Sequence, residues 1–184
     1  MKAQFLTYAL TLCVLICMYG CTADDEFEHG YPCSFIYDMS IHNTGVVYSV
    51  VRSPGLFAFV YKKGVNPLTI QAELNDGKTN TPTYITTEKE KRLTWTLGAK
   101  TGLIIGLNPS NELYAFDRQC PNCIESNVSG TFNLTWTDNG QQVYCTKCKR
   151  KYDLNNGGYP SNGGGKKLMR YYSTFDGTVL RVWN

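Results

Sequence analysis

The sequence predicts an all-β protein built from antiparallel strands. From Cys33 onward, short apolar or alternating runs are separated by turn residues, a pattern typical of strands joined by tight turns. No stretch keeps a helical period of apolar residues, apart from a short charged one at 86–92. Tyrosine is common, with 13 residues, and aromatic side chains favour strands.

The expected strands are the apolar runs at 46–51, 56–61, 93–97, 102–107, 113–116, 131–136, 168–172 and 179–183. Turn signals separate them, and Asp138-Asn139-Gly140 between two such runs predicts a hairpin. The more polar segment 64–99 is expected to form an inserted hairpin or a long loop. We see no internal repeat and no second domain boundary, so a single domain is predicted.

The N-terminal segment has the features of an export signal. Lys2 precedes an uncharged, mostly apolar run, Ala3–Tyr19, which is shorter than the about 20 residues of a spanning helix. Met18-Tyr19-Gly20 stands before Cys21, and this stretch resembles the lipobox of bacterial lipoproteins. The resemblance implies a signal peptide at 1–20, lipidation of Cys21 and attachment to a membrane through that lipid. Plain secretion is the alternative.

The acidic run Thr22–Glu26 looks like the surface-export tag of Bacteroidetes lipoproteins and also suits a solvated tether. We therefore expect an outer-membrane lipoprotein that faces either the cell surface or the periplasm, with a lipidated acidic tether at 21–34 and a β domain at 35–184. The net charge of +3 gives no electrostatic support to a nucleic-acid partner. The sequence does not identify a protein or ligand partner.

Two C-x-x-C brackets carry the clearest chemical signal. Cys120-Pro121-Asn122-Cys123 is followed by Cys145-Thr146-Lys147-Cys148, and the gap at 124–144 is close to the about 15–20 residues of zinc ribbons. Two such turns that face each other build a tetrahedral site of four sulfurs. The predicted metal ligands are therefore Cys120, Cys123, Cys145 and Cys148. Zinc is preferred, because four thiolates without an open position form a closed structural site.

Three other uses of these cysteines are open. Iron in the same four thiolates, as a [2Fe–2S] cluster or a single iron, would make the protein an electron carrier. Disulfides are compatible with export, and pairs between the brackets would make a disulfide-stapled binding module. A thioredoxin-like redox motif requires a helix after the bracket, and we expect none here.

The surroundings of the brackets resemble a known family. Leu113–Pro121 looks like the lead into the first cluster loop of Rieske-type proteins, and Cys145–Asp153, with Gly157, Gly158 and Pro160, resembles their second loop. Tyr171–Trp183 is similar to the strands that close that fold. The resemblance is to exported Rieske-like proteins of Bacteroidetes. It implies a small antiparallel β-sandwich or barrel, with a metal-binding subdomain of two facing loops at about 114–165.

The chain departs from the Rieske pattern at both histidine positions. A Rieske cluster takes one Cys and one His from each loop, whereas Asn122 and Cys148 occupy the two histidine positions here. The two histidines of the chain, His29 and His42, lie far upstream and are not expected to be ligands. We therefore expect a Rieske-like fold that carries a zinc-ribbon-like site of four cysteines.

Other candidates point to a non-enzymatic protein. Cys33 is expected to be a small buried apolar residue or a reactive thiol. The glycine-rich segment 155–167 lacks the P-loop pattern and is expected to cover the metal site. No catalytic dyad or triad is visible, so a binding or scaffold role is expected, or electron transfer if the site is redox-active. The aromatic residues that could form a binding patch, or simply pack, are Tyr84, Trp95 and Tyr159.

Overall fold

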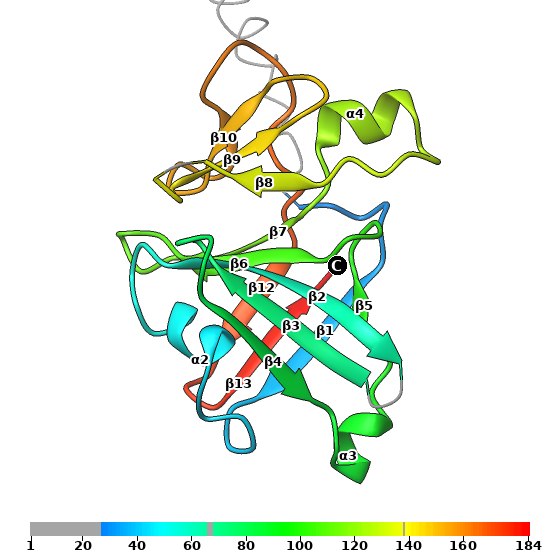
Figure 1. The fold of residues 1–184 in the computed structure, drawn as a ribbon, viewed down its shortest axis with the longest axis vertical. Coiled ribbons are helices and arrows are strands. Elements are labelled where there is room, and N and C mark those ends of the chain that lie inside the picture. Colours follow the sequence, from blue (N-terminus) through cyan, green and yellow to red (C-terminus); the bar gives the residue numbers. More distant parts are fainter. Residues whose placement is uncertain (1–26, 66–67, 138) are drawn as a thin grey trace, which may run out of the picture.

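The structure is a computed structural model that describes residues 27–65, 68–137 and 139–184. The predicted signal peptide, the lipidation site at Cys21, the acidic run at 22–26 and Asp138 lie outside the described residues. The described chain forms three antiparallel sheets and no closed barrel, which confirms the predicted all-β antiparallel fold (Figure 1).

Two of the sheets form the larger part of the molecule, which we call the body. The first has the order β12 (Tyr172–Phe175), β13 (Val179–Trp183), β1 (Cys33–Asp38) and β5 (Thr96–Leu97). The second has the order β4 (Asn80–Tyr84), β3 (Leu68–Leu74), β2 (Phe57–Val65), β6 (Leu103–Leu107) and β7 (Leu113–Asp117).

The third sheet lies at one end of the body, above β6 and β7 in Figure 1. Its order is β11 (Tyr159–Pro160), β10 (Lys151–Asp153), β9 (Gln142–Cys145) and β8 (Leu134–Trp136). Together with helix α4 (Pro121–Ser126) and the loops that join them, residues 118–168, it forms what we call the metal subdomain.

The central sheet of the body is buried on both faces along the first half of β2 and along β6 and β7. Along β2, Ala58 and Val60 pack into the core shared with the first sheet, whereas Phe57 and Phe59 pack into a second cluster beneath the metal subdomain. Successive side chains of a strand point to opposite faces, so an unbroken apolar run is what a strand covered on both sides requires. The metal subdomain is therefore seated on an apolar surface of the body.

The prediction of a strand at 46–51 is wrong, because this segment forms helix α2 (Val46–Val50). Its buried residues are Val46, Val47 and Val50, a spacing that puts them on one face of a helix. Gly45, with φ 89°, turns the chain into the helix, and the Val46 N–H donates to Thr81 Oγ1 at 2.9 Å. Burial against the sheets outweighs the preference of valine for strands.

Other expected elements form with shifted bounds. The segment 64–99 supplies β3 and β4, a hairpin at the edge of the central sheet, and helix α3 (Glu88–Lys91). Thr87 caps α3 by accepting a hydrogen bond from the Glu90 N–H at 3.3 Å. Of the expected strand at 93–97, only Thr96 and Leu97 pair. The expected hairpin around residues 138–140 joins β8 to β9.

Residues before β1 also contact the body. Phe27 forms a bridge with Arg170 and stacks on Tyr172, with ring centroids 3.9 Å apart. The Glu28 N–H donates to the Arg170 carbonyl at 2.6 Å. The last part of the expected tether, from Phe27 onward, therefore packs on the folded domain. None of the helices described is long and apolar enough to cross a membrane.

Candidate metal centre

The fold brings the four bracket cysteines together. Their Sγ atoms all lie within 4.8 Å of one another, and the pairs Cys120–Cys148 and Cys123–Cys145 are separated by 3.6 and 3.7 Å. A tetrahedral zinc site with Zn–S bonds of about 2.3 Å places its sulfurs about 3.8 Å apart. The cluster therefore fits the ligand shell of one tetrahedral metal ion. It is the one such group of possible ligands among the described residues.

The spacing of the sulfurs also tests two of the alternatives. A disulfide bond is about 2.05 Å long, and all five cysteines of the described chain are free, so the disulfide-stapled alternative is not found. A [2Fe–2S] cluster divides its four thiolates between two iron atoms, which spreads them further apart than the ligands of a single ion. The compact cluster fits one ion better than two.

The first bracket lies at the start of helix α4. Cys120 is the residue before the helix, Pro121 occupies its first turn, and the Cys120 carbonyl accepts hydrogen bonds from the N–H groups of Cys123 and Ile124 at 3.2 and 3.1 Å. The expectation that no helix follows either bracket is therefore wrong for the first one. Proline at the first helical position favours such a turn, since its missing N–H would have no partner there. The thioredoxin context is still absent, because every strand pairing of this region is antiparallel.

The second bracket forms a tight turn at the end of β9. The Cys145 N–H donates to the Arg150 carbonyl at 2.9 Å, and the Lys149 N–H donates to the Cys145 carbonyl at 2.9 Å. Lys149 adopts φ 62°, a left-handed conformation that closes the turn. These bonds hold Cys145 and Cys148 with their sulfurs toward the first bracket.

Two polar residues beside the sulfurs were not expected from the sequence. The Tyr152 hydroxyl lies 3.2 Å from Cys120 Sγ and accepts a hydrogen bond from Asn122 Nδ2 at 2.8 Å. With this bond accepted by the hydroxyl oxygen, its hydrogen is available to the sulfur. Asn122, which stands at a histidine position of the Rieske pattern, thus orients a donor toward a predicted ligand. An Asn inside a bracket gives no sequence signal for this role.

The glycine-rich segment lies against both brackets, as expected for a cover loop. The Lys166 N–H donates to Asn122 Oδ1 at 3.1 Å, and Arg150 Nε donates to the Gly164 carbonyl at 2.8 Å. Gly165 has φ +140°, and a Cβ there would lie 2.8 Å from both Arg150 Nε and Asn122 Oδ1. Only glycine allows the loop to approach this closely.

Burial and hydrogen bonding shift the pKa values of the cysteine thiols in opposite directions. Burial raises the pKa of Cys120 to about 11 and also raises that of Cys123. Burial alone would raise the pKa of Cys148 too, but hydrogen bonds from the backbone and side chain of Arg150 lower it to about 6. A metal ion must therefore displace protons from buried thiols, which makes its affinity depend on pH.

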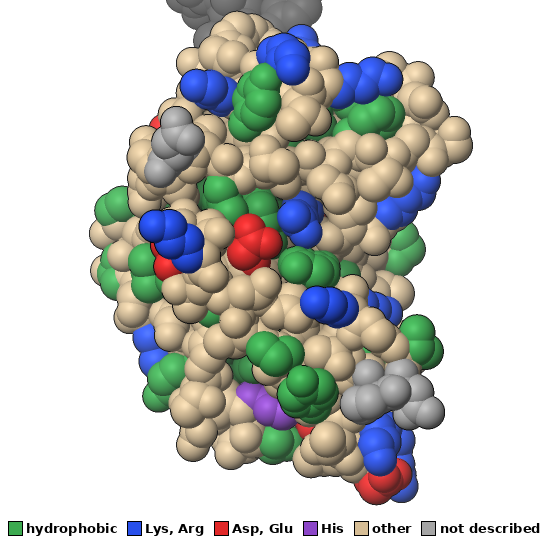
Figure 2. Space-filling model, in the orientation of Figure 1, with side chains coloured by type: hydrophobic (Ala, Val, Ile, Leu, Met, Phe, Trp, Pro, Cys, Tyr) green, Lys and Arg blue, Asp and Glu red, His purple; other side chains and the backbone are tan. Residues whose placement is uncertain are grey.

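Cations surround the exposed side of the site. Figure 2 shows Lys and Arg side chains at several points on the visible surface of the metal subdomain, with few acidic side chains among them. Lys147, Lys149 and Lys151 are exposed around the second bracket. Four thiolates around a divalent ion carry a net charge of about −2, and these cations lie where they offset it.

The other predicted residues lie outside the cluster. Cys33 is buried in β1, and burial raises its pKa to about 12, so it is the small buried apolar residue that was one of the two expectations. His42 pairs with buried Glu90 at 2.5 Å, far from the brackets in sequence and fold. Trp95 is buried in the body core, whereas Tyr84 and Tyr159 are exposed.

Asp117 is a buried carboxylate between the body and the metal subdomain. It accepts hydrogen bonds from the Ala99 N–H at 2.6 Å, the Gln119 N–H at 2.7 Å and the Tyr171 hydroxyl at 2.9 Å. Burial raises its pKa to about 6, although these hydrogen bonds act in the opposite direction. The bonds tie the start of the metal subdomain to the body.

No family model matches the chain, and comparisons with curated proteins and with solved structures gave no match. The resemblance to Rieske-like lipoproteins therefore rests on the sequence motifs alone.

Proposed function

We propose that this protein is a zinc-stabilised binding or scaffold protein of the cell envelope. Cys120, Cys123, Cys145 and Cys148 would hold one zinc ion, and zinc would supply cross-linking of the two brackets rather than catalysis. The observation that carries the proposal is the set of four sulfurs within 4.8 Å of one another. All four positions of a tetrahedral ion would be taken by the protein, so no position is open to a substrate.

The surroundings of the sulfurs support the same role. Three of the four cysteines are buried, and the Tyr152 hydroxyl adds a hydrogen bond to one of them. The proposal extends to a lipid anchor at Cys21, an outer-membrane location and a relation to exported Rieske-like lipoproteins. These parts are supported by the lipobox-like and Rieske-like motifs of the sequence.

The second candidate is electron transfer by a single iron in the same thiolates. It is favoured by Cys148, the one partly exposed cysteine of the cluster, which would place the metal near the surface. The hydrogen bond from Tyr152 to Cys120 is the kind of contact that raises the potential of an iron–thiolate site.

Elemental analysis together with an absorption spectrum separates the two candidates. We expect residues 22–184, purified without added metal or a nickel column, to hold about one zinc per chain and to show no visible band. The matched control is Cys33→Ala, which should keep the metal, whereas Cys123→Ser should lose most of it. One iron per chain with charge-transfer bands would establish electron transfer instead. Absence of any metal, with all four thiols reactive, would refute both candidates.

A further inference from the structure

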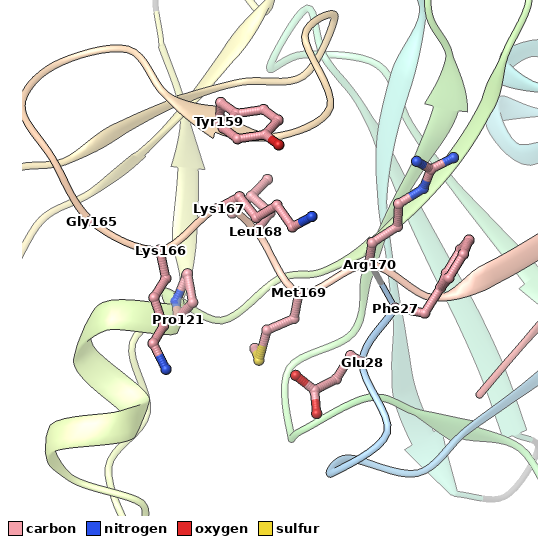
Figure 3. Close-up of a pocket in the computed structure, with 10 residues that line it drawn as sticks. All are labelled: Phe27, Glu28, Pro121, Tyr159, Gly165, Lys166, Lys167, Leu168, Met169 and Arg170. Carbon is pink, nitrogen blue, oxygen red and sulfur yellow. The ribbon is translucent and has the colours of Figure 1, made fainter. Parts of the chain in front are cut away.

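An open cleft of about 680 Å³ lies between the metal subdomain and the body (Figure 3). Its walls come from three separated parts of the chain: the segment before β1, the first bracket, and residues 159–170. The volume is in the range of small-molecule sites, about 300–1,000 Å³. Neither the zinc proposal nor the family resemblance gives this cleft a role.

The cleft is lined by both apolar and charged side chains. Half of the lining residues are apolar or aromatic, namely Phe27, Pro121, Tyr159, Leu168 and Met169, and the others are Glu28, Gly165, Lys166, Lys167 and Arg170. Lys167 is half-buried in the wall, and its amino group lies 5.7 Å from the centre of the Tyr159 ring. Within the described part of the chain, Lys167 makes no ion pair. By contrast, Lys166 is paired with Glu125 at 2.6 Å.

Charge is unevenly placed along the cleft. In Figure 3 the Lys167 amino group lies on the side of the Tyr159 hydroxyl, while the Glu28 carboxylate lies at the other end, beside Met169. Glu28 Oε1 accepts a hydrogen bond from the Gly30 N–H at 2.6 Å, which holds the carboxylate in place. An anionic group would therefore be favoured at the Lys167 end and disfavoured at the Glu28 end.

We infer that this cleft binds a small amphiphilic anion, with a planar apolar body and one acidic group placed beside Lys167. The aromatic and aliphatic walls remove the apolar body from water, and Tyr159 offers an exposed ring against which it packs. The ammonium group of Lys167, which makes no ion pair with a described residue, supplies the charge that selects an anion over a neutral molecule.

The wall of the cleft is joined to the metal site. Pro121 lies inside the first bracket, and the Lys166 backbone is bonded to Asn122 in the same bracket. The Lys166–Glu125 ion pair ties the cleft wall to α4 as well. The first bracket therefore supports the wall of the cleft, so a metal that fixes this bracket would also fix the ligand site.

The test uses two fluorescent probes that differ in one group. The anion is 8-anilinonaphthalene-1-sulfonate, and the neutral analogue is N-phenyl-1-naphthylamine, which has the same aromatic body without the sulfonate. Titration of the purified, metal-loaded protein should give one saturable site for the anion. Its Kd should be about tenfold lower than that of the neutral analogue.

Two nearly isosteric variants should change the affinity for the anion in opposite directions. Lys167→Gln should raise Kd by about five- to tenfold, and Glu28→Gln should lower it by about two- to threefold, because the repulsive charge is removed. Lys63→Gln, an exposed change in β2 that neither lines the cleft nor lies beside the brackets, is the matched control and should leave Kd within a factor of two.

Metal content is measured for each variant, so that loss of the metal is not mistaken for loss of the ligand site. Equal affinity for the two probes would overturn the inference. So would a Kd unchanged by Lys167→Gln in a protein that keeps its metal, or an equal loss in Lys63→Gln.

Discussion

The strands of the central sheet run for five to nine residues, whereas those of the third sheet have two to four. The body core also gathers apolar side chains from both of its sheets and from α2. Under the metal subdomain, the central sheet supplies much of the apolar cluster. Apart from the cysteines, the subdomain contributes to it the buried Leu134, Val143, Tyr152, Leu154 and Leu168 and the half-buried Phe132 and Trp136.

The difference teaches that one chain can stabilise two regions by different means. The body buries enough apolar surface to hold its long strands together. The short strands of the metal subdomain bury less apolar surface. The four cysteines converge inside this subdomain, where a bound metal would supply the remaining stability.

Removal of the metal is expected to have the largest effect and to separate the two regions. Zinc binding at four-ligand sites is worth about 10–16 kcal/mol in small peptides, which is comparable to the stability of a whole domain. A chelator should therefore abolish the hydrogen-exchange protection of β8, β9 and β10 while β1, β2 and β3 stay protected. Cys123→Ser should reproduce this pattern. Loss of protection in both regions at once would show that the body also depends on the metal.

A cavity in the body core should produce the converse result. Phe35 is fully buried in β1, and Phe35→Ala should lower the free energy of unfolding by about 3–5 kcal/mol. Urea unfolding measures this loss. The purified variant should still hold one metal ion per chain without denaturant, because no ligand is touched. A variant that loses its metal in proportion to its stability would show that the two regions are one cooperative unit.

The pH dependence should have opposite signs in the two regions. The pKa of Asp117 is raised to about 6 by burial, so between pH 6 and 4 the folded body binds more protons than the unfolded chain. Its contribution to stability therefore increases as the pH falls, by on the order of 2 kcal/mol, and is lost as the pH rises toward 6. Metal binding should weaken over the same range, because protons compete for the thiolates.

Two measurements check these opposite pH dependences. Urea unfolding can be followed by the fluorescence of buried Trp95 after Trp136→Phe and Trp183→Phe, and metal release by an indicator dye. Asp117→Asn is the control, since it removes the titrating group. The difference from it separates Asp117 from carboxylates such as Asp38 and Asp176, whose pKa values are lowered by hydrogen bonds. If the free energy of unfolding of the body falls by the same amount between pH 6 and 4 with Asp117 and with Asp117→Asn, the pH effect does not come from Asp117.

Sequence reasoning recovered the features that depend on local pattern. The β class, the hairpin at the edge of the central sheet and the convergence of the brackets all follow from periodicity, turn residues and spacing. It failed at α2, where Val46, Val47 and Val50 are strand formers that a tertiary contact holds in a helix. It also missed α4, because a six-residue helix started by a proline leaves no periodic signal.

The residues that surround the sulfurs could not be predicted from the sequence for a different reason. Tyr152 reaches Cys120 only because β10 pairs with β9, and Asn122 meets Lys166 only because a glycine-rich loop folds back over the bracket. Such contacts join residues distant in sequence and depend on the completed fold. The cleft beside them has the same origin, since its walls come from three separated segments.

One strand pairing in the body has a consequence for the order of events during folding. β1 is joined to β13 along five residue pairs, and this pairing joins the two ends of the described chain. The two brackets, by contrast, are separated only by residues 124–144. Contacts between residues that are close in sequence form faster than contacts between residues that are far apart. The four sulfurs can therefore bind their ion before β1 pairs with β13. A folding chain would bind its metal first and complete its largest core last.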